Sequence, residues 1–467
     1  MAIDRDFILY RNFGAYTEVP ADYYTHFNVK RGLRNADGTG VVAGVTSISN
    51  VHGYLTDEGV KVPSPGRLTL RGYDIGDLVD NVAAEGRFGY EELAFLLWSG
   101  DLPVQEDLDR FNQLIGSYRD LPQNFVANLI MNSPSKDAMN MLARSVLLLY
   151  SFDEDADSLE QHHEIDTAVQ LLSRLPRLAV LSYLARGQVE HQPMYINPPR
   201  EDLSTAETIL YMLRPNMEWT AEEAKVLDIM LMLHAEHGGG NNSTFTTRVL
   251  TSSGTDAYSA YAGGISSLKG PRHGGANIRA AAMQADLKET VSNWQDEGQV
   301  ADYLRRVIRG EANDGTGLIY GMGHAVYTLS DPRAVICKRY ARELAAGTEY
   351  EAEFDLIDSI ERLSPQVFRE EKGSTKAICA NIDMYSGLVY RMLGIPEKLY
   401  TPLFAVSRLA GWAAHRFEEI TSGRRIMRPA YKAMNMYREY VPMCSRKTII
   451  QKEVTQNIEL HEDVPND

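Results

Sequence analysis

Helical patterning that begins near residue 76 and continues through most of the chain is the sequence feature that most constrains the fold. Thr220 and Glu223 form a capping box, which opens a helix by satisfying its free backbone N–H groups. The apolar segment 90–100 ends at a glycine, a helix stop signal. Further helical patterns occupy residues 137–152, 165–186, 204–213, 220–237, 282–312, 332–346, 350–363, 381–393 and 401–419. Strand-like pieces are confined to residues 41–75, so the chain is predicted to be mostly α-helical with few short strands near the N-terminus.

Length and segmentation limit the domain organisation. A chain of 467 residues is long enough for about two to four domains. It contains no low-complexity block, no repeat of roughly 20–50 residues and no linker rich in Gly/Ser or Pro. A second domain is therefore expected to be inserted within the first rather than joined to its end.

Charge and cysteine usage narrow the class of partner. The formal net charge of −16 argues against nucleic acid or an anionic membrane surface as the main partner. Anionic metabolites stay possible, because a few arginines can build a positive pocket in an acidic protein. Three cysteines without a CxxC pair indicate reduced thiols. The N-terminus resembles no targeting peptide and no stretch approaches the roughly 18 apolar residues of a membrane helix, so a cytoplasmic protein is expected.

The stretch GMGHAVYTLSDPR, residues 321–333, combines a histidine and an arginine around a turn. Its glycines allow a backbone to approach a ligand closely, and Asp331 before Pro332 is pushed out of helical geometry. His324 can hydrogen-bond a carbonyl or an oxyanion, and Arg333 can clamp a carboxylate. A small oxo acid would suit both, although a structural turn with a satisfied histidine is an equally simple interpretation.

Two more histidine motifs lie upstream. HAEH places His234 and His237 on one face of a helix end, where histidines stabilise the helix dipole. A metal site there is an alternative, but the motif lacks the HExxH pattern and a third ligand nearby in sequence. His273 precedes two glycines and a helix-compatible run, an environment that favours a neutral, hydrogen-bond-donating imidazole. A simple turn is the alternative for that motif.

One aspartate and two arginines complete the candidates. Asp383 lies between Ile382 and Met384, so its pKa is expected to be raised, which suits a general base; a helix N-cap is the alternative. Arg408 lies within an apolar helix and needs an anionic partner there. Arg428 precedes a proline in an extended segment and, taken alone, reads as a surface cation.

Together these residue types suit one kind of chemistry. Neutral histidines could donate hydrogen bonds to a thioester enolate and to a ketone, while an aspartate removes a proton beside the thioester carbonyl. Arginines could hold a dicarboxylate. The sequence therefore favours a site for carbon–carbon condensation that uses neither a metal nor a redox cofactor.

These motifs resemble the citrate synthase family, from about residue 42 to residue 429. GVTSIS, RGYDIGDL and FGYEELAFLLWSGDLP are similar to its N-terminal signatures. LMLHAEH, SLKGPRHGGAN, GMGHAVYTLSDPRA, NIDMYSG and FAVSRLAGWAAH resemble its active-site segments and follow in the family's order. The resemblance implies a multi-helical fold with a large domain, residues 1–276 and 386–467, and a small inserted helical domain, residues 277–385, that closes over oxaloacetate. It favours the si-type enzyme of the tricarboxylic acid cycle.

The resemblance also implies residue roles. His273 would stabilise the acetyl-CoA enolate, Asp383 would abstract the methyl proton, and His324 would hydrogen-bond the oxaloacetate ketone. The substrate's carboxylates and hydroxyl would be bound by His237, Arg333, Arg408 and Arg428. The last of these matches an arginine that relatives supply from the neighbouring subunit, which implies a homodimer. Lys376 is our candidate for a CoA contact. Acetyl-CoA would be a substrate, and no cofactor is implied.

Three alternatives stay open at the level of sequence. A 2-methylcitrate synthase would use propionyl-CoA with the same residues, since one methylene shifts preference by only about 1–3 kcal/mol. A non-catalytic sensor of CoA or a carboxylate would be favoured by loss of His273, His324 or Asp383, but all three are present. A metal hydrolase built on His234 and His237 would be removed by insensitivity to chelators.

Overall fold

The computed structural model describes residues 17–35, 37–57, 60–191, 194–373, 377–423, 425–434 and 437–446. The chain forms two compact units, Met1–Val41 with Arg428–Asp467, and Val42–Met427. The division into domains at residues 277 and 385 falls inside the second unit and stays a prediction.

The described part of the first unit consists of short elements. Helix α3 spans Ala21–His26, a 3-10 turn spans Arg31–Leu33, and an isolated bridge pairs Arg34 with Gly40. A second 3-10 turn spans Met443–Ser445 near the C-terminus.

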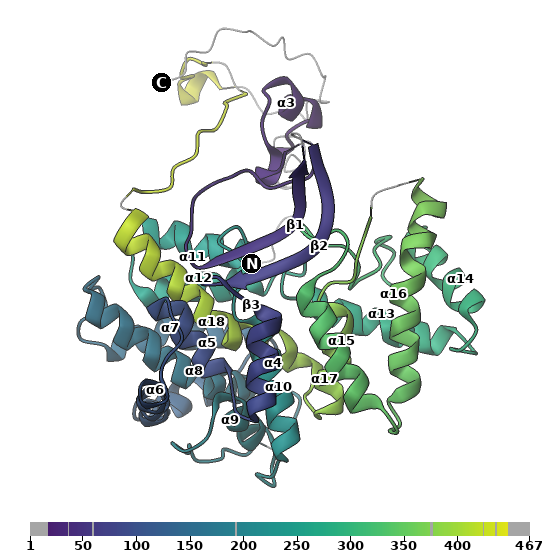
Figure 1. Cartoon of the computed structure of the whole chain (residues 1–467). Coiled ribbons are helices and arrows are strands. Elements are labelled where there is room, and N and C mark those ends of the chain that lie inside the picture. The colour runs from purple at the N-terminus through teal and green to yellow at the C-terminus, as the bar shows by residue number, and fades with distance from the viewer. Residues whose placement is uncertain are drawn as a thin grey trace. The chain divides into compact units, whose positions relative to one another are not determined.

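The second unit begins with a small antiparallel sheet in the order β1-β2-β3 (Figure 1). Strand β1 spans Ser49–Asp57, β2 spans Val60–Leu70 and β3 spans Tyr73–Asp74. The register pairs Ser49 with Leu70 and shifts at a bulge between His52 and Tyr54. All three strands lie within residues 41–75, where the sequence predicted strand-like pieces, but residues 41–46 form no strand. The regular elements in the rest of the described second unit are helical.

Most of the second unit consists of α-helices that begin and end at local signals. Thr220 and Glu223 form the predicted capping box at the start of α10, and Gly100 ends α5 with a left-handed backbone. The mostly α-helical prediction is confirmed. The helices are α4 (Ile75–Glu85), α5 (Tyr90–Ser99), α6 (Gln105–Ser117), α7 (Ala138–Leu149), α8 (Gln161–Val189), α9 (Thr205–Leu213), α10 (Ala221–His234), α11 (Asn242–Ser252), α12 (Ala257–Leu268), α13 (Ala276–Thr290), α14 (Glu297–Ile308), α15 (Pro332–Ala345), α16 (Glu351–Lys372), α17 (Asp383–Met392) and α18 (Tyr400–Glu418). None of the helices in the described ranges is long and apolar enough to cross a membrane.

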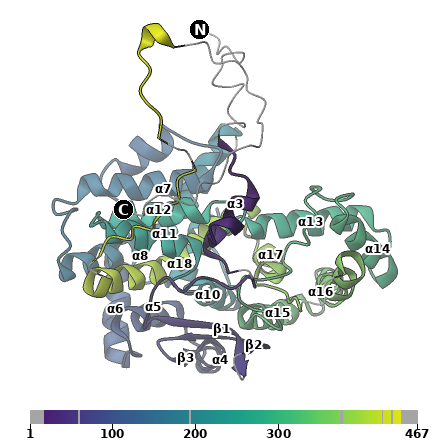
Figure 2. The same ribbon diagram turned by 90° about the horizontal axis from the view of Figure 1, so that it is seen from above.

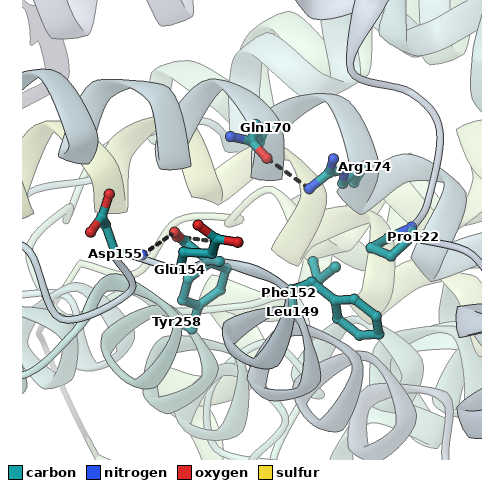
Figure 3. A pocket seen from close by; sticks show the side chains of 9 residues that line it. Pro122, Leu149, Phe152, Glu154, Asp155, Gln170, Arg174 and Tyr258 are labelled. Carbon is teal, nitrogen blue, oxygen red and sulfur yellow. Dashed lines mark hydrogen bonds between the residues drawn. The ribbon is translucent and has the colours of Figure 1, made fainter.

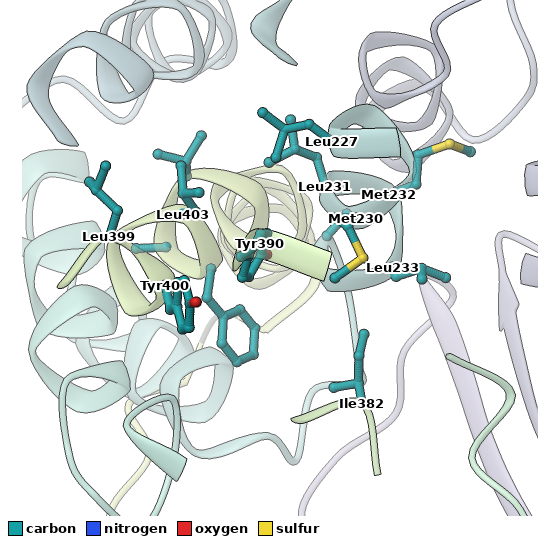
Figure 4. Packing of buried hydrophobic residues seen from close by; sticks show 14 of the residues in the cluster. Leu227, Met230, Leu231, Met232, Leu233, Ile382, Tyr390, Leu399, Tyr400 and Leu403 are labelled. Atoms are coloured by element: carbon teal, nitrogen blue, oxygen red, sulfur yellow. The ribbon is translucent and has the colours of Figure 1, made fainter. Parts of the chain in front are cut away.

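Helix α18 forms the centre of the core. Every side chain from Tyr400 to Arg416 is buried, because α5, α8, α10, α11 and α12 all pack against this helix. Figure 4 shows Leu227 and Leu231 of α10 close to Leu403 of α18. This packing leaves no solvent to neutralise a charge on α18, so any ionised group there needs an ionic or hydrogen-bonding partner.

Helices α13 to α17 gather on one side of the second unit, away from α7, α8, α11 and α12 (Figures 1 and 2). Two polar contacts join α13 to α17: Asn277 Nδ2 donates to Ser386 Oγ at 3.2 Å, and Gln284 Nε2 donates to the carbonyl of Met384 at 2.9 Å. Since α13 follows the His273 motif and α17 begins at Asp383, this packing brings two distant motifs into one region.

Candidate active site

His237 lies just beyond the end of α10, in a buried loop. Its Nε2 lies 3.1 Å from the hydroxyl oxygen of Tyr327, a residue 90 positions further along the chain. Burial lowers the pKa of His237 well below its usual range, and the positive charges of Arg333 and Arg408 lower it further, as do His324 and His273. His237 is therefore neutral at physiological pH.

His324 belongs to a loop shaped by two glycines with positive φ, Gly321 at 84° and Gly323 at 86°. A bridge between Met322 and Ala380 ties this loop to the segment before α17. The Nδ1 atom of His324 accepts hydrogen bonds from the backbone N–H groups of Val326 at 3.0 Å and Tyr327 at 3.1 Å. A neutral imidazole has one N–H, so this geometry assigns the proton to Nε2.

The two histidine rings meet edge to face. The centroids of His237 and His324 lie 5.0 Å apart with an interplanar angle of 86°. Tyr327 stacks on His324 at 4.6 Å and also contacts the ring of His237 at 5.4 Å. The loop therefore brings together two of the predicted substrate-binding histidines.

Arg333 starts α15 and is buried. Asp331 is the N-cap of that helix, with the extended backbone that its position before Pro332 predicts. Its carboxylate accepts from Arg333 Nε at 3.1 Å and from Nη2 at 2.7 Å. The guanidinium is thus held in a fixed direction by an anion that is itself fully buried.

Asp383 is the first residue of α17, while Ile382 occupies the N-cap position. The alternative of an N-cap aspartate is therefore wrong. Its Oδ1 atom is buried and accepts no hydrogen bond from the described residues. Burial raises the pKa of Asp383 to about 7, because it outweighs the opposing effect of Arg333, and Asp331 raises the pKa further. The carboxyl group therefore titrates near neutral pH, which suits a general base.

His273 lies in the loop before α13. Its Nε2 is 3.0 Å from Ser243 Oγ, and its ring centroid is 6.2 Å from that of Phe404. Burial lowers the pKa of His273 to about 4, with a further contribution from the charge of Arg408. This ring is also neutral at physiological pH, as its motif predicted.

Arg408 is fully buried in α18, and its guanidinium lies over the ring of Phe404 at 4.7 Å. Its Nε donates to the carbonyl of His234 at 2.6 Å, but its two terminal nitrogens have no hydrogen-bond partner among the described residues. Burial lowers the pKa of Arg408 to about 9, although Glu236 raises it. Buried donors without a partner are rare, so the site is shaped for an anion.

The structure thus gathers six of the eight predicted site residues around His237 and Arg333: these two with His273, His324, Asp383 and Arg408. Arg428 is exposed and belongs to the first unit. Lys376 lies outside the described residues. The predicted roles of both stay predictions.

Sequence reasoning missed the residues that support this site. Tyr327 and Asp331 were read only as parts of a turn, and their contacts depend on folding. The HAEH motif alone gives Glu236 no role, yet its carboxylate accepts hydrogen bonds from His415 Nε2 at 2.9 Å and from Ser49 Oγ at 2.8 Å. The available signal was a carboxylate shortly after the apolar helical pattern that ends at Leu233, since such a group needs partners when buried.

Two further features of the described residues bear on the alternatives to this site. In the described ranges, no group of three or more His, Cys, Asp or Glu side chains is arranged to hold a metal ion. His234 Nδ1 lies 2.7 Å from the carbonyl of Met230. Burial lowers the pKa of His234 to about 3, so the ring is neutral and the predicted stabilisation of the helix dipole by this histidine is wrong. A separate cavity of about 250 Å³ beside α8, shown in Figure 3, is lined by Arg174, Tyr258 and an acidic loop, and it contains none of the predicted site residues.

Comparisons with known proteins agree with this geometry. The family profile described as "Citrate synthase, C-terminal domain" matches residues 35–430. The citrate synthase of Acidithiobacillus ferridurans is 34% identical over 87% of this chain and 97% of that protein. The 2-methylcitrate synthase 1 of Corynebacterium glutamicum is 32% identical over 90% of this chain and 98% of that protein.

A solved structure matches the fold over nearly its full length. It is the citrate synthase of Thermoplasma acidophilum in a ternary complex with carboxymethyl coenzyme A and oxaloacetate. The TM-score is 0.72 with 27% sequence identity, covering 89% of this chain and 99% of that one. The chain therefore belongs to the citrate synthase family, whose enzymes transfer acyl groups.

Proposed function

We propose that this protein condenses acetyl-CoA with oxaloacetate and hydrolyses the resulting citryl-CoA to citrate and CoA. One observation carries the proposal: the fully buried guanidinium of Arg408 presents two nitrogens without a protein partner beside a second buried guanidinium, that of Arg333. A buried cation without an anion is costly, and a dicarboxylate supplies two anionic groups. The solved ternary complex of the Thermoplasma relative contains oxaloacetate and a CoA analogue, which supports this choice of substrates.

The first chemical step is removal of a proton from the methyl group of acetyl-CoA. The Asp383 carboxylate accepts this proton, and its pKa of about 7 makes it a stronger base than an ordinary aspartate. The electron pair of the C–H bond moves toward the thioester oxygen, giving an enolate. A neutral His273 donates a hydrogen bond to that oxygen and stabilises the developing charge.

The second step forms the carbon–carbon bond. The enolate carbon attacks the ketone carbon of oxaloacetate, and the ketone oxygen takes the Nε2 proton of His324 to become the hydroxyl of citryl-CoA. The proton that Asp383 removed from the methyl group is returned to His324 through solvent, so both groups regain their starting states. His237, Arg333 and Arg408 hold the carboxylates so that the two reacting carbons stay close. Water then cleaves the thioester bond of citryl-CoA, releasing citrate, CoA and a proton.

We also propose the oligomeric state of the enzyme, its closure over the substrate and its place in metabolism. A homodimer would let Arg428 of one subunit reach the substrate of its neighbour, which suits an arginine that is exposed within its own unit. Closure of residues 277–385 over oxaloacetate would exclude water before acetyl-CoA reacts, and Lys376 would contact CoA. Without a metal or a redox cofactor, the enzyme would serve the tricarboxylic acid cycle in the cytoplasm.

A 2-methylcitrate synthase is the second candidate function. Relatives with that name match this chain at 31–32% identity, close to the 32–34% range of the relatives named citrate synthase. The extra methylene of propionyl-CoA changes binding by only about 1–3 kcal/mol, so the same residues serve both reactions. The relative kcat/KM for acetyl-CoA and propionyl-CoA separates the two candidates.

The proposal is tested by following free CoA thiol released by the purified protein. Oxaloacetate is supplied with either acyl-CoA, and the Asp383→Ala variant serves as the control. Faster release with acetyl-CoA that collapses in the variant supports citrate synthesis, and a propionyl-CoA preference supports methylcitrate synthesis. Absence of release with both substrates from folded dimers overturns the proposal.

A further inference from the structure

Tyr327 contacts both of the histidines that face each other in the site. Its hydroxyl oxygen lies 3.1 Å from Nε2 of His237, and its ring stacks on His324 at 4.6 Å with an interplanar angle of 26°. Its backbone N–H donates to Nδ1 of His324 at 3.1 Å. One residue thus contacts both rings through hydrogen bonds.

The hairpin of β1 and β2 packs closely against Tyr327 and its loop. A Cβ atom on Gly53 would lie 3.0 Å from Tyr327 Cα and 2.6 Å from the carbonyl oxygen of Val326. A Cβ atom on Gly66 would lie 2.6 Å from Tyr327 Cδ1 and 2.1 Å from the carbonyl oxygen of Ser330. Any side chain at these two positions would therefore displace the Tyr327 loop.

Two hydrogen bonds join the same hairpin to the loop residues that follow Tyr327. Thr328 Oγ1 donates to the carbonyl of Gly53 at 3.1 Å, and the N–H of Gly66 donates to Ser330 Oγ at 3.0 Å. Tyr327 is itself 2% exposed. Its ring is therefore held by packing and its backbone by hydrogen bonds, which leaves little freedom to rotate.

We propose that Tyr327 is the positioning residue of the site, setting the proton tautomer of His237 and the orientation of His237 toward His324. The expected effect on the KM for oxaloacetate rests on the proposed function, whereas the tautomer of His237 does not depend on it. A phenol O–H is a stronger acid than the N–H of a neutral imidazole, so we take the Tyr327 hydroxyl as the donor to Nε2 of His237, which leaves the imidazole proton on Nδ1. The backbone N–H of the same residue fixes the opposite assignment on His324, where Nδ1 accepts.

The consequence for catalysis is a defined hydrogen-bonding pattern toward oxaloacetate. If His237 could exchange tautomers, a fraction of the enzyme would present a lone pair where the substrate oxygen needs a donor. Loss of one neutral hydrogen bond costs about 0.5–1.5 kcal/mol, which is up to about tenfold in affinity. Tyr327→Phe is therefore expected to raise the KM for oxaloacetate by about tenfold while keeping the ring stacking on His324.

Two matched controls separate positioning from general stability. Tyr303→Phe removes another buried hydroxyl, which donates to Asp286 at 2.5 Å and lies on α14. Its KM for oxaloacetate is expected to stay within about twofold of wild type. Gly66→Ala is expected to impair oxaloacetate binding, whereas Gly44→Ala, where a Cβ would meet nothing within 4 Å, is not. A merely structural defect would lower the concentration of active enzyme, and hence kcat, without moving KM.

The direct test is ¹⁵N NMR of protein labelled at histidine, without substrate, with His237 assigned from the spectrum of His237→Gln. In wild type, the two nitrogens of His237 should show one protonated and one unprotonated signal. In Tyr327→Phe, both signals should move toward averaged values while those of His324 stay fixed. An unchanged His237 tautomer in folded Tyr327→Phe overturns the inference. A wild-type enzyme without condensation activity that still shows the shift overturns the proposed function alone.

Discussion

Arg408 Nε donates to the carbonyl oxygen of His234 at 2.6 Å, and this is the only hydrogen bond that the described residues offer to its guanidinium. Its two terminal nitrogens meet no hydrogen-bond acceptor among the described residues. Glu236 attracts the charge and Arg333 repels it, so protein neighbours compensate the buried cation only in part. The fold therefore buries a guanidinium whose missing anionic partner a dicarboxylate would supply.

Replacing Arg408, and separately Arg416 on the same helix, tests whether the Arg408 guanidinium binds the substrate. Arg408→Met should raise the KM for oxaloacetate by about 100-fold or more, because a buried charge contact with the substrate is lost. Without substrate, the free energy of unfolding should fall little or even rise by about 1 kcal/mol, since an incompletely paired charge has been removed.

Arg416 is also fully buried in α18, but its Nε donates to Glu164 at 2.7 Å and its Nη2 at 2.5 Å. Arg416→Met should therefore lower the free energy of unfolding by about 3–5 kcal/mol, because Glu164 is left unpaired. Urea unfolding of both variants gives the comparison. Equal destabilisation of the two variants would contradict the assignment of Arg408 to substrate binding.

The pH dependence of the reaction should report Asp383. A general base must be ionised, so kcat/KM for acetyl-CoA should rise with pH and level off above about 7, the pKa of this carboxyl group. His273, with a pKa of about 4, stays neutral near neutral pH and should add no second pH-dependent change in kcat/KM. Initial rates between pH 5.5 and 8.5 measure the profile (about one unit or more on each side of the pKa). A flat profile across neutral pH would speak against Asp383 as the base.

The same carboxyl group should make the folded protein more stable at lower pH. Its pKa is about 7 when folded and about 3.9 when unfolded, so the folded state holds the proton more tightly. The stabilising contribution is complete below the unfolded pKa and is lost as pH rises through about 7. Asp383→Asn should thus gain about 2–4 kcal/mol over wild type at pH 8 and almost nothing at pH 4. Urea unfolding at the two pH values checks this difference; a gain that is the same at both would refute it.

Mixed dimers test whether Arg428 acts across a subunit interface. Asp383→Ala and Arg428→Met subunits should each be nearly inactive alone. Co-expression should restore about a quarter of the wild-type activity, because half of the random dimers are mixed and each holds one intact site. Activity of the mixture that equals the average of the two inactive proteins would place Arg428 in its own subunit's site, and an active Arg428→Met protein would place it outside any site.

Local signals in the sequence were enough to predict much of the fold. The capping box of Thr220 and Glu223 opens α10, and the backbone before Pro332 starts α15, since both depend on neighbouring residues alone. The raised pKa of Asp383 also followed from its apolar neighbours. These features need no knowledge of how distant segments meet.

Contacts between distant segments could not be predicted in the same way. The pairing of His237 with Tyr327 joins residues 90 positions apart, and Glu236 meets His415 across 179 positions. Gly53 and Gly66 carry no sign in the sequence that a loop from residues 326–330 passes against them. Such contacts arise from the packing of whole elements, so single motifs do not encode them.

Release of CoA from acetyl-CoA in the presence of oxaloacetate is the most direct test of the central claim. Wild-type protein should release thiol and form citrate only when both substrates are present. The Asp383→Ala variant should be slower by about 10²- to 10⁴-fold, the contribution of a general base. Folded wild-type protein that releases no thiol with either acetyl-CoA or propionyl-CoA, or an Asp383→Ala variant as fast as wild type, would contradict the account.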